Sequence, residues 1–165
     1  MLRPATDQDK EIVRVWRNHP DVRAVSLTRD EISPQQHENY WKSLRGNESR
    51  KVFIYERDGR PAGVVTFFDI DPSAKRAMWG YYLDNDGLTR TGELLPAWIE
   101  IQRQAVRYAD DELGLDVLEG EVLDANAAVR RMNKRNGFEE VATDQREIDG
   151  ETVTVHTIRR TRPDR

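Results

Sequence analysis

The middle of the chain has a strand-like pattern of apolar residues, and this limits the possible folds more than any other feature. Three runs rich in β-branched and aromatic residues follow one another, at residues 52–56, 63–68 and 76–83. Asp58-Gly59 lies between the first two, and such a dipeptide between two β-rich runs is typical of a tight hairpin turn. The sequence therefore predicts an antiparallel three-stranded meander over residues 52–83.

Helical patterns lie on both sides of this meander. Before it, residues 9–18 carry an apolar face that His19-Pro20 ends, and an irregular stretch follows. Ser33 then opens a second helix, with Pro34 at its first position and Gln36 completing a capping box. After the meander, residues 84–92 read as a polar loop. The sequence then predicts two helices, over residues 95–109 and 125–135.

The remaining segments read as strands, at residues 1–6, 117–123, 138–142 and 152–158, with Asp149-Gly150 as a further turn. The predicted order is β-α-α-β-β-β-loop-α-β-α-β-β. A chain of 165 residues suits one domain, here residues 1–165. We expect an α+β fold with a mixed, mostly antiparallel sheet of six or seven strands and about four helices.

Composition excludes several classes of function. A net charge of −4 argues against nucleic acid as a partner, and the basic segment 159–165 reads as a flexible, solvated tail. Without cysteine there is no thiolate catalysis, disulfide or cysteine-based zinc site, and we predict no metal. No run approaches the roughly 18 apolar residues of a membrane span, so we expect a cytoplasmic protein.

Two predicted strand-to-helix junctions are candidate phosphate sites, because free N–H groups and the positive end of a helix dipole meet there. The first is the loop 84–92, in which Gly87 and Gly92 permit close approach and Arg90 supplies charge. The second begins at Asn126, with Arg130 and Asn133 on the same helix face. The alternatives are an ordinary turn at the first junction, and an N-cap with a solvated face at the second.

The order of these elements resembles the GCN5-related N-acetyltransferase (GNAT) family over essentially the whole chain. The most specific match is Asn126 followed eleven residues later by Gly137-Phe138, and the segments 113–115 and 119–122 are also similar. The resemblance implies a three-layer acyl-CoA N-acyltransferase fold. It also implies acetyl transfer from acetyl-CoA, as co-substrate, to a small-molecule amine, with a homodimer left open.

The same resemblance implies which residues hold the donor. Cofactor contacts are expected from Tyr82 and Leu83, together with Tyr81, along the pantetheine arm, and from Arg90, Thr91, Gly92, Asn126, Arg130 and Asn133. This chain departs from the family in two places. Its glycine loop has altered spacing and contains Pro96, which lacks an N–H. Many members carry a general-acid Tyr where this chain has Asn133, which cannot donate a proton to a thiolate.

The N-terminal half resembles a subgroup that contains amino-sugar-nucleotide acetyltransferases and ribosomal-protein N-terminal acetyltransferases. The resemblance rests on Trp16-Arg17-Asn18, Val22-Arg23 and the pattern of Ser33, His37 and Trp41. It implies an acceptor pocket lined by Trp16, Arg17, Asn18 and His37, with Arg17 facing a phosphate. Trp16 as core and His37 as a packed helix residue are the alternatives.

In such a site the amine attacks the thioester directly, and a base removes its proton. Residues 76–83 contain no carboxylate, so the base must come from elsewhere. Asp69 is the first candidate, with Tyr81 and His37 in reserve, and a turn role for Asp69 is the alternative. Two other functions stay open: a protein N-terminal acetyltransferase, and a non-catalytic acyl-CoA or metabolite-binding domain.

Overall fold

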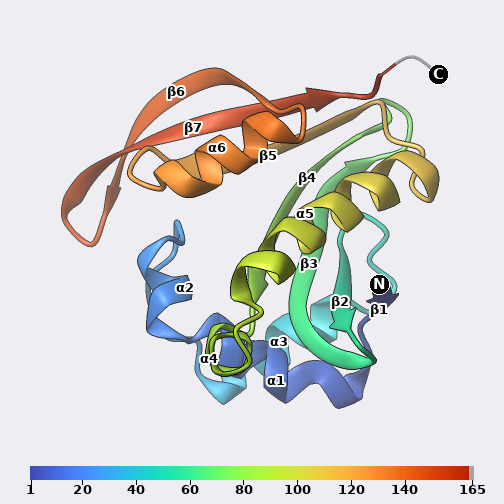
Figure 1. Cartoon of the computed structure of the whole chain (residues 1–165), viewed down its shortest axis with the longest axis vertical. Coiled ribbons are helices and arrows are strands. Elements are labelled where there is room, and N and C mark those ends of the chain that lie inside the picture. Colours follow the sequence, from blue (N-terminus) through green and yellow to red (C-terminus); the bar gives the residue numbers. More distant parts are fainter. Residues whose placement is uncertain (164–165) are drawn as a thin grey trace.

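The computed structural model describes residues 1–163, which form a seven-stranded mixed sheet with helices on both faces (Figure 1). The strand order is β1-β2-β3-β4-β5-β7-β6. The strands are β1 (Leu2–Pro4), β2 (Lys51–Arg57), β3 (Arg60–Asp71), β4 (Arg76–Leu83), β5 (Val117–Leu123), β6 (Glu139–Ile148) and β7 (Glu151–Thr161). A 3-10 turn, η1 (Asp7–Asp9), precedes the helices α1 (Lys10–Arg17), α2 (Pro20–Ala24), α3 (Pro34–Ser43), α4 (Asn85–Arg90), α5 (Leu94–Asp111) and α6 (Ala127–Arg135).

The predicted fold class and the central meander are confirmed. β2, β3 and β4 pair antiparallel in sequence order, and the turn at Asp58-Gly59 has positive φ at both residues. The predicted capping box of α3 also forms. The Ser33 hydroxyl accepts the N–H of Gln36 at 3.1 Å, and the Gln36 side chain accepts the N–H of Ser33 at 2.9 Å. These elements depend on short-range signals, which the sequence carries directly.

Alternating side chains of β2 divide the core between two helical layers. Phe53 and Tyr55 pack in one cluster with Ile101 of α5. Ile54, between them, packs in another cluster with Val13 of α1 and Trp41 of α3. Because successive side chains of a strand point to opposite faces, the sheet is the middle of three layers. Within residues 1–163, none of the helices combines the length and apolarity needed to cross a bilayer.

The structure contains two short helices that the sequence did not predict. Residues 1–163 therefore form six helices, where about four were expected. The expected loop 84–92 contains α4, in which the Asp84 carboxylate accepts the N–H of Gly87 at 3.0 Å and caps the helix. The expected irregular stretch after His19 contains α2, in which the His19 ring accepts the N–H of Asp21 at 3.1 Å. Pro20 ends α1 but also suits the first position of α2.

The predicted basic tail is wrong at its start, because Arg159, Arg160 and Thr161 belong to β7. The Arg160 guanidinium is buried and makes a bidentate ion pair with Asp110 at 2.8 and 2.9 Å. Arg159 pairs with Glu119 at 3.1 Å. Charged partners therefore keep this segment in the sheet. The last two residues of the predicted tail, 164 and 165, lie outside the described residues.

Candidate active site

β4 and β5 run parallel but pair only at their first residues. The register joins Arg76 to Val117, Ala77 to Leu118 and Met78 to Glu119, and within residues 1–163 it goes no further. Beyond that point β4 stays paired with β3 as far as Leu83, and β5 stays paired with β7 as far as Leu123. The sheet therefore opens into two halves, with β1–β4 on one side and β5–β7 on the other (Figure 1).

A cavity of about 360 Å³ lies in this opening. Its walls are the diverging strands, from Trp79 to Leu83 in β4 and from Gly120 to Val122 in β5. Residues of α5 and α6 line it from one face of the sheet, and residues of α2 line it from the other. Both helical layers therefore contribute to its walls.

A hydrogen-bonded network borders the cavity on the α5 and α6 side. The indole N–H of Trp98 donates to the hydroxyl of Tyr81, and Gln102 Nε2 lies 3.4 Å from the same oxygen. Gln102 Nε2 also donates to Asn133 Oδ1 at 2.8 Å, while Asn136 donates to Gln102 Oε1. Burial raises the pKa of Tyr81 to about 12. Its phenol is therefore protonated at neutral pH, which makes Tyr81 unsuitable as the general base.

Carboxylates reach the cavity from the other face. Glu121 of β5 lines it and is ion-paired with Arg146 of β6, and Asp21 of α2 lines it next to Ser26. The sequence analysis missed both carboxylates. Alternation along residues 117–123 would have placed Glu121 opposite the buried Val122. Nothing in the sequence showed that β4 and β5 part beside it.

The structure brings five of the predicted site residues together. Tyr81, Tyr82, Leu83, Asn126 and Asn133 all line the cavity. Asn126 precedes α6 at the N-cap position, but within the described chain its side chain makes no capping bond. The structure therefore does not show the side-chain cap held as the alternative for Asn126, and the residue is one of those lining the cavity.

Asp69 lies apart from these residues. It is exposed, has a φ of 49° and sits where the β3–β4 register shifts between Phe68 and Asp71. Those neighbours face Met78 and Arg76, at the end of β4 that is still joined to β5. The structure thus places the first predicted base at the closed end of the opening, in an irregular part of β3 shortly before the turn into β4.

The predicted phosphate loop flanks the cavity. Arg90 and Thr91 line a separate hollow of about 310 Å³, together with Arg57 and Arg60. Gly92, with a φ of 73°, turns the chain from α4 into α5. The first turn of α5 borders the main cavity through Leu94 and Trp98. The start of an 18-residue helix therefore points its positive dipole end to this region.

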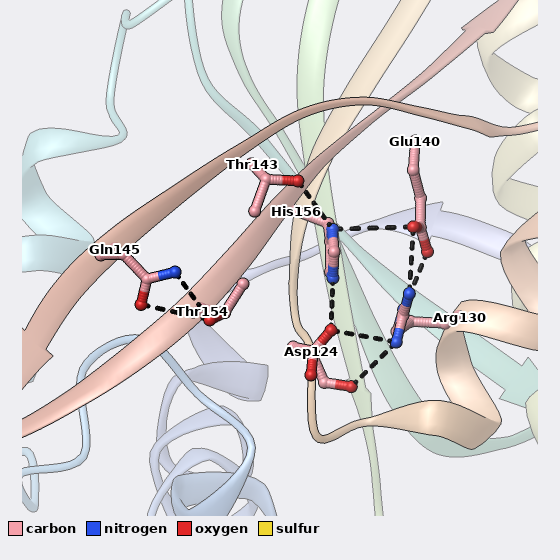
Figure 2. Close-up of polar contacts among 7 residues, drawn as sticks. All are labelled: Asp124, Arg130, Glu140, Thr143, Gln145, Thr154 and His156. Atoms are coloured by element: carbon pink, nitrogen blue, oxygen red, sulfur yellow. Dashed lines mark hydrogen bonds and ion pairs between the residues drawn. The ribbon is translucent and has the colours of Figure 1, made fainter.

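Arg130 is engaged away from the cavity (Figure 2). Its guanidinium donates to Glu140 at 2.8 and 3.1 Å and to the Asp124 carboxylate at 3.2 Å. His156, buried beside them, lies 2.7 Å from Asp124. Figure 2 shows this group joining the end of β5 to α6 and to the β6–β7 hairpin. In the described chain Arg130 thus pairs with these carboxylates and does not line the cavity.

We expect Arg130→Gln to lower stability by about 0.5–1 kcal/mol, and the Tm by about 1–4 °C, while changing the KM for acetyl-CoA less than ~2-fold. The Arg130 guanidinium holds the pKa of Glu140 below its usual value. The lowered pKa adds stability above pH ~4.3, which is lost as pH falls through the folded-state pKa. Thermal melts at pH 7 and pH 3 test this, with exposed Arg131→Gln as control. A large rise in the KM for acetyl-CoA would instead support the expected cofactor contact of Arg130.

The predicted acceptor residues belong to α1, α3 and the residue after α1. They do not line the cavity. Asn18 exchanges hydrogen bonds with the backbone of Ile32 at 2.7 and 2.8 Å. His37 is buried, lies 2.7 Å from the carbonyl of Lys10 and packs on Trp41, and burial lowers its pKa. Trp16 packs against the cluster that contains Trp41. The packing alternatives for Trp16 and His37 therefore match the structure.

Arg17 differs from these neighbours. One guanidinium nitrogen, Nη2, donates to the carbonyl of Thr28 at 2.8 Å. The other, Nη1, is buried and has no partner among residues 1–163. Burial lowers the pKa of Arg17, and its charge interacts with Tyr82 of the cavity wall. A buried donor without a partner in the described chain calls for an acceptor from elsewhere, such as a group on a ligand.

Comparisons with known proteins agree with this geometry. Residues 1–139 match the family model described as an acetyltransferase (GNAT) domain. The acetyltransferase PseH of Campylobacter jejuni (serotype O:23/36, strain 81-176) is 27% identical over 131 residues, covering 79% of this chain and 77% of that protein.

Solved structures share the fold. The Campylobacter jejuni N-acetyltransferase PseH in complex with acetyl coenzyme A aligns with a TM-score of 0.69 at 16% identity, covering 99% of this chain and 100% of that one. The spermidine N-acetyltransferase from Vibrio cholerae in complex with CoA and spermine aligns with a TM-score of 0.80 at 16% identity, covering 98% and 94%.

Proposed function

The chain belongs to the GNAT family and is an acetyl-CoA-dependent N-acetyltransferase, and on that premise we propose that its acceptor is the amino group of a sugar nucleotide. The observation that carries this proposal is the unpartnered, buried Nη1 of Arg17, whose charge interacts with Tyr82 of the cavity wall. A phosphate oxygen on the acceptor would complete its hydrogen bonding, because guanidinium groups pair well with phosphate. The resemblance of the N-terminal half to a subgroup that contains amino-sugar-nucleotide acetyltransferases gives further support.

The donor fits the opening between β4 and β5. The β4 backbone from Trp79 to Leu83 leaves peptide groups without a strand partner across the gap, and a thin amide-containing arm can pair with them. The start of α5 can receive the pyrophosphate, although Pro96 removes one N–H. Asn126 and Asn133 add amide groups from α6. The altered glycine loop therefore still leaves an N-terminal helix end at the required place.

The acceptor enters from the α2 face, where Glu121 is the proposed base. The amine nitrogen attacks the thioester carbonyl carbon, the C–N bond forms and the C–S bond breaks. Sulfur leaves with the bonding electron pair, and the proton lost by the nitrogen passes to the Glu121 carboxylate. Arg146, ion-paired with Glu121, orients that carboxylate. We propose Asp21 as a further group that attracts the amine.

One observation favours a second candidate acceptor, a polyamine. Asp21 and Glu121 make the α2 side of the cavity partly acidic, which suits a substrate with several positive charges. Arg17 argues against it, since a buried guanidinium repels a polycation.

A protein N-terminus is the third candidate. A cytoplasmic location and a homodimer stay predictions of the sequence.

The test is a turnover screen with acetyl-CoA against amino-sugar nucleotides, spermidine and N-terminal peptides. We expect turnover of the sugar nucleotides, and expect Arg17→Met to raise the acceptor KM by about 10- to 100-fold without changing the KM for acetyl-CoA. The same sugar without its nucleotide should be a poor acceptor for both forms. Turnover of spermidine alone, or an Arg17→Met variant with unchanged acceptor KM, would refute the sugar-nucleotide proposal.

A further inference from the structure

The Tyr81 hydroxyl has a free proton at the cavity wall. Both of its lone-pair directions receive N–H groups, one from Trp98 and one from Gln102. No protein group within residues 1–163 accepts the hydroxyl proton. The ring is held in place by stacking on Trp79, with 5.3 Å between centroids and 22° between planes. A donor fixed in this way can only give its proton to something inside the cavity.

The network behind Tyr81 keeps this orientation. Gln102 is fully buried, and Asn136 holds its carbonyl oxygen. The amide nitrogen of Gln102 must therefore face both Asn133 and Tyr81. Asn133 cannot serve as an acid because an amide does not release a proton near neutral pH, and its Oδ1 already accepts from Gln102. Asn133 therefore positions Gln102. Among these hydrogen-bonded side chains, Tyr81 carries the hydroxyl group that can donate a hydrogen bond.

We propose that the Tyr81 hydroxyl donates a hydrogen bond to the thioester sulfur as the C–S bond breaks. This inference rests on the proposed function, since it assumes a thioester in the opening between β4 and β5. Sulfur leaves with the electron pair, and the hydrogen bond stabilises its negative charge. The amine proton goes to Glu121, and the thiolate then takes a proton from solvent. Tyr81 stays protonated throughout, in keeping with a pKa raised to about 12 by burial.

The experiment compares Tyr81→Phe with the wild type on acetyl-CoA and on its selenium analogue. We expect kcat on acetyl-CoA to fall by about 10- to 100-fold with the acetyl-CoA KM nearly unchanged. The loss should shrink below about 3-fold on the selenoester, because a selenolate needs less stabilisation as a leaving group. Tyr108→Phe is the matched control, since Tyr108 packs between Phe53 and Phe67 away from the cavity.

Two results would overturn this role for Tyr81: an equal loss on both donors, or an unchanged kcat. Wild-type protein that binds acetyl-CoA but acetylates no acceptor would instead refute the proposed function. If Tyr81→Phe does not fold, Trp98→Phe replaces it, because removing that N–H lets the hydroxyl rotate. It should then lower kcat on acetyl-CoA and leave the selenoester rate nearly unchanged, and an equal loss on both again contradicts the role.

Discussion

Gly80→Phe is expected to lower kcat/KM by at least about 10³-fold while leaving the fold intact. Gly80 lies in β4 at the cavity wall, and a Cβ built there meets no atom of the described chain within 4 Å. The new side chain can therefore enter the cavity without displacing the core. It would occupy the space in which the thioester and the amine must meet. Acetyl-transfer kinetics and a thermal melt of the same sample measure both effects.

Gly63→Ala is the contrasting control for Gly80→Phe. Its Cβ would lie 2.9 Å from the carbonyl oxygen of Tyr82 and 3.0 Å from side-chain carbons of Leu83 and Ile101. This overpacking should cost about 1–3 kcal/mol and lower the Tm. Gly63→Ala should thus lose stability, whereas Gly80→Phe should lose activity. A Gly80→Phe enzyme that retains a tenth of wild-type kcat/KM would mean that the reaction takes place elsewhere.

Glu121→Gln should lower kcat by about 10³-fold with little change in stability. The amide has the shape of the carboxylate and keeps a hydrogen-bonding oxygen for Arg146, but it cannot accept the proton of the amine. The KM for acetyl-CoA should not change, because Glu121 lies on the face of the sheet opposite the core residue Val122. Steady-state kinetics with each substrate varied in turn separates these effects.

Asp69→Asn is the matched control for Glu121→Gln. It makes the same chemical change at an exposed residue with a φ of 49°, a conformation that Asn tolerates. We expect wild-type kcat and wild-type stability from it. If Asp69→Asn loses activity and Glu121→Gln does not, the base is the residue that sequence patterns favoured, and the role proposed for Glu121 is wrong.

Short-range signals made the meander and the α3 cap predictable. Asp58-Gly59 needs only its own backbone conformation to turn, and the Ser33–Gln36 box closes within one helical turn. Tyr81, Tyr82 and Leu83, which the family resemblance marked for the donor, line the cavity in the structure. The short helices α2 and α4 were missed, since Pro20 and Asp84 signal a break and a cap equally well.

The sequence by itself determined the strands, the longer helices and their order, and the family resemblance pointed to β4 as the proposed donor strand. Tertiary structure alone decided which charged groups line the cavity. β4 and β5 pair for three residues and then follow different partners, and this divergence brings Glu121 to the cavity while leaving Asp69 at the closed end. It also ties Arg130 to Glu140. Such contacts join separate strands and helices, so no local pattern encodes them.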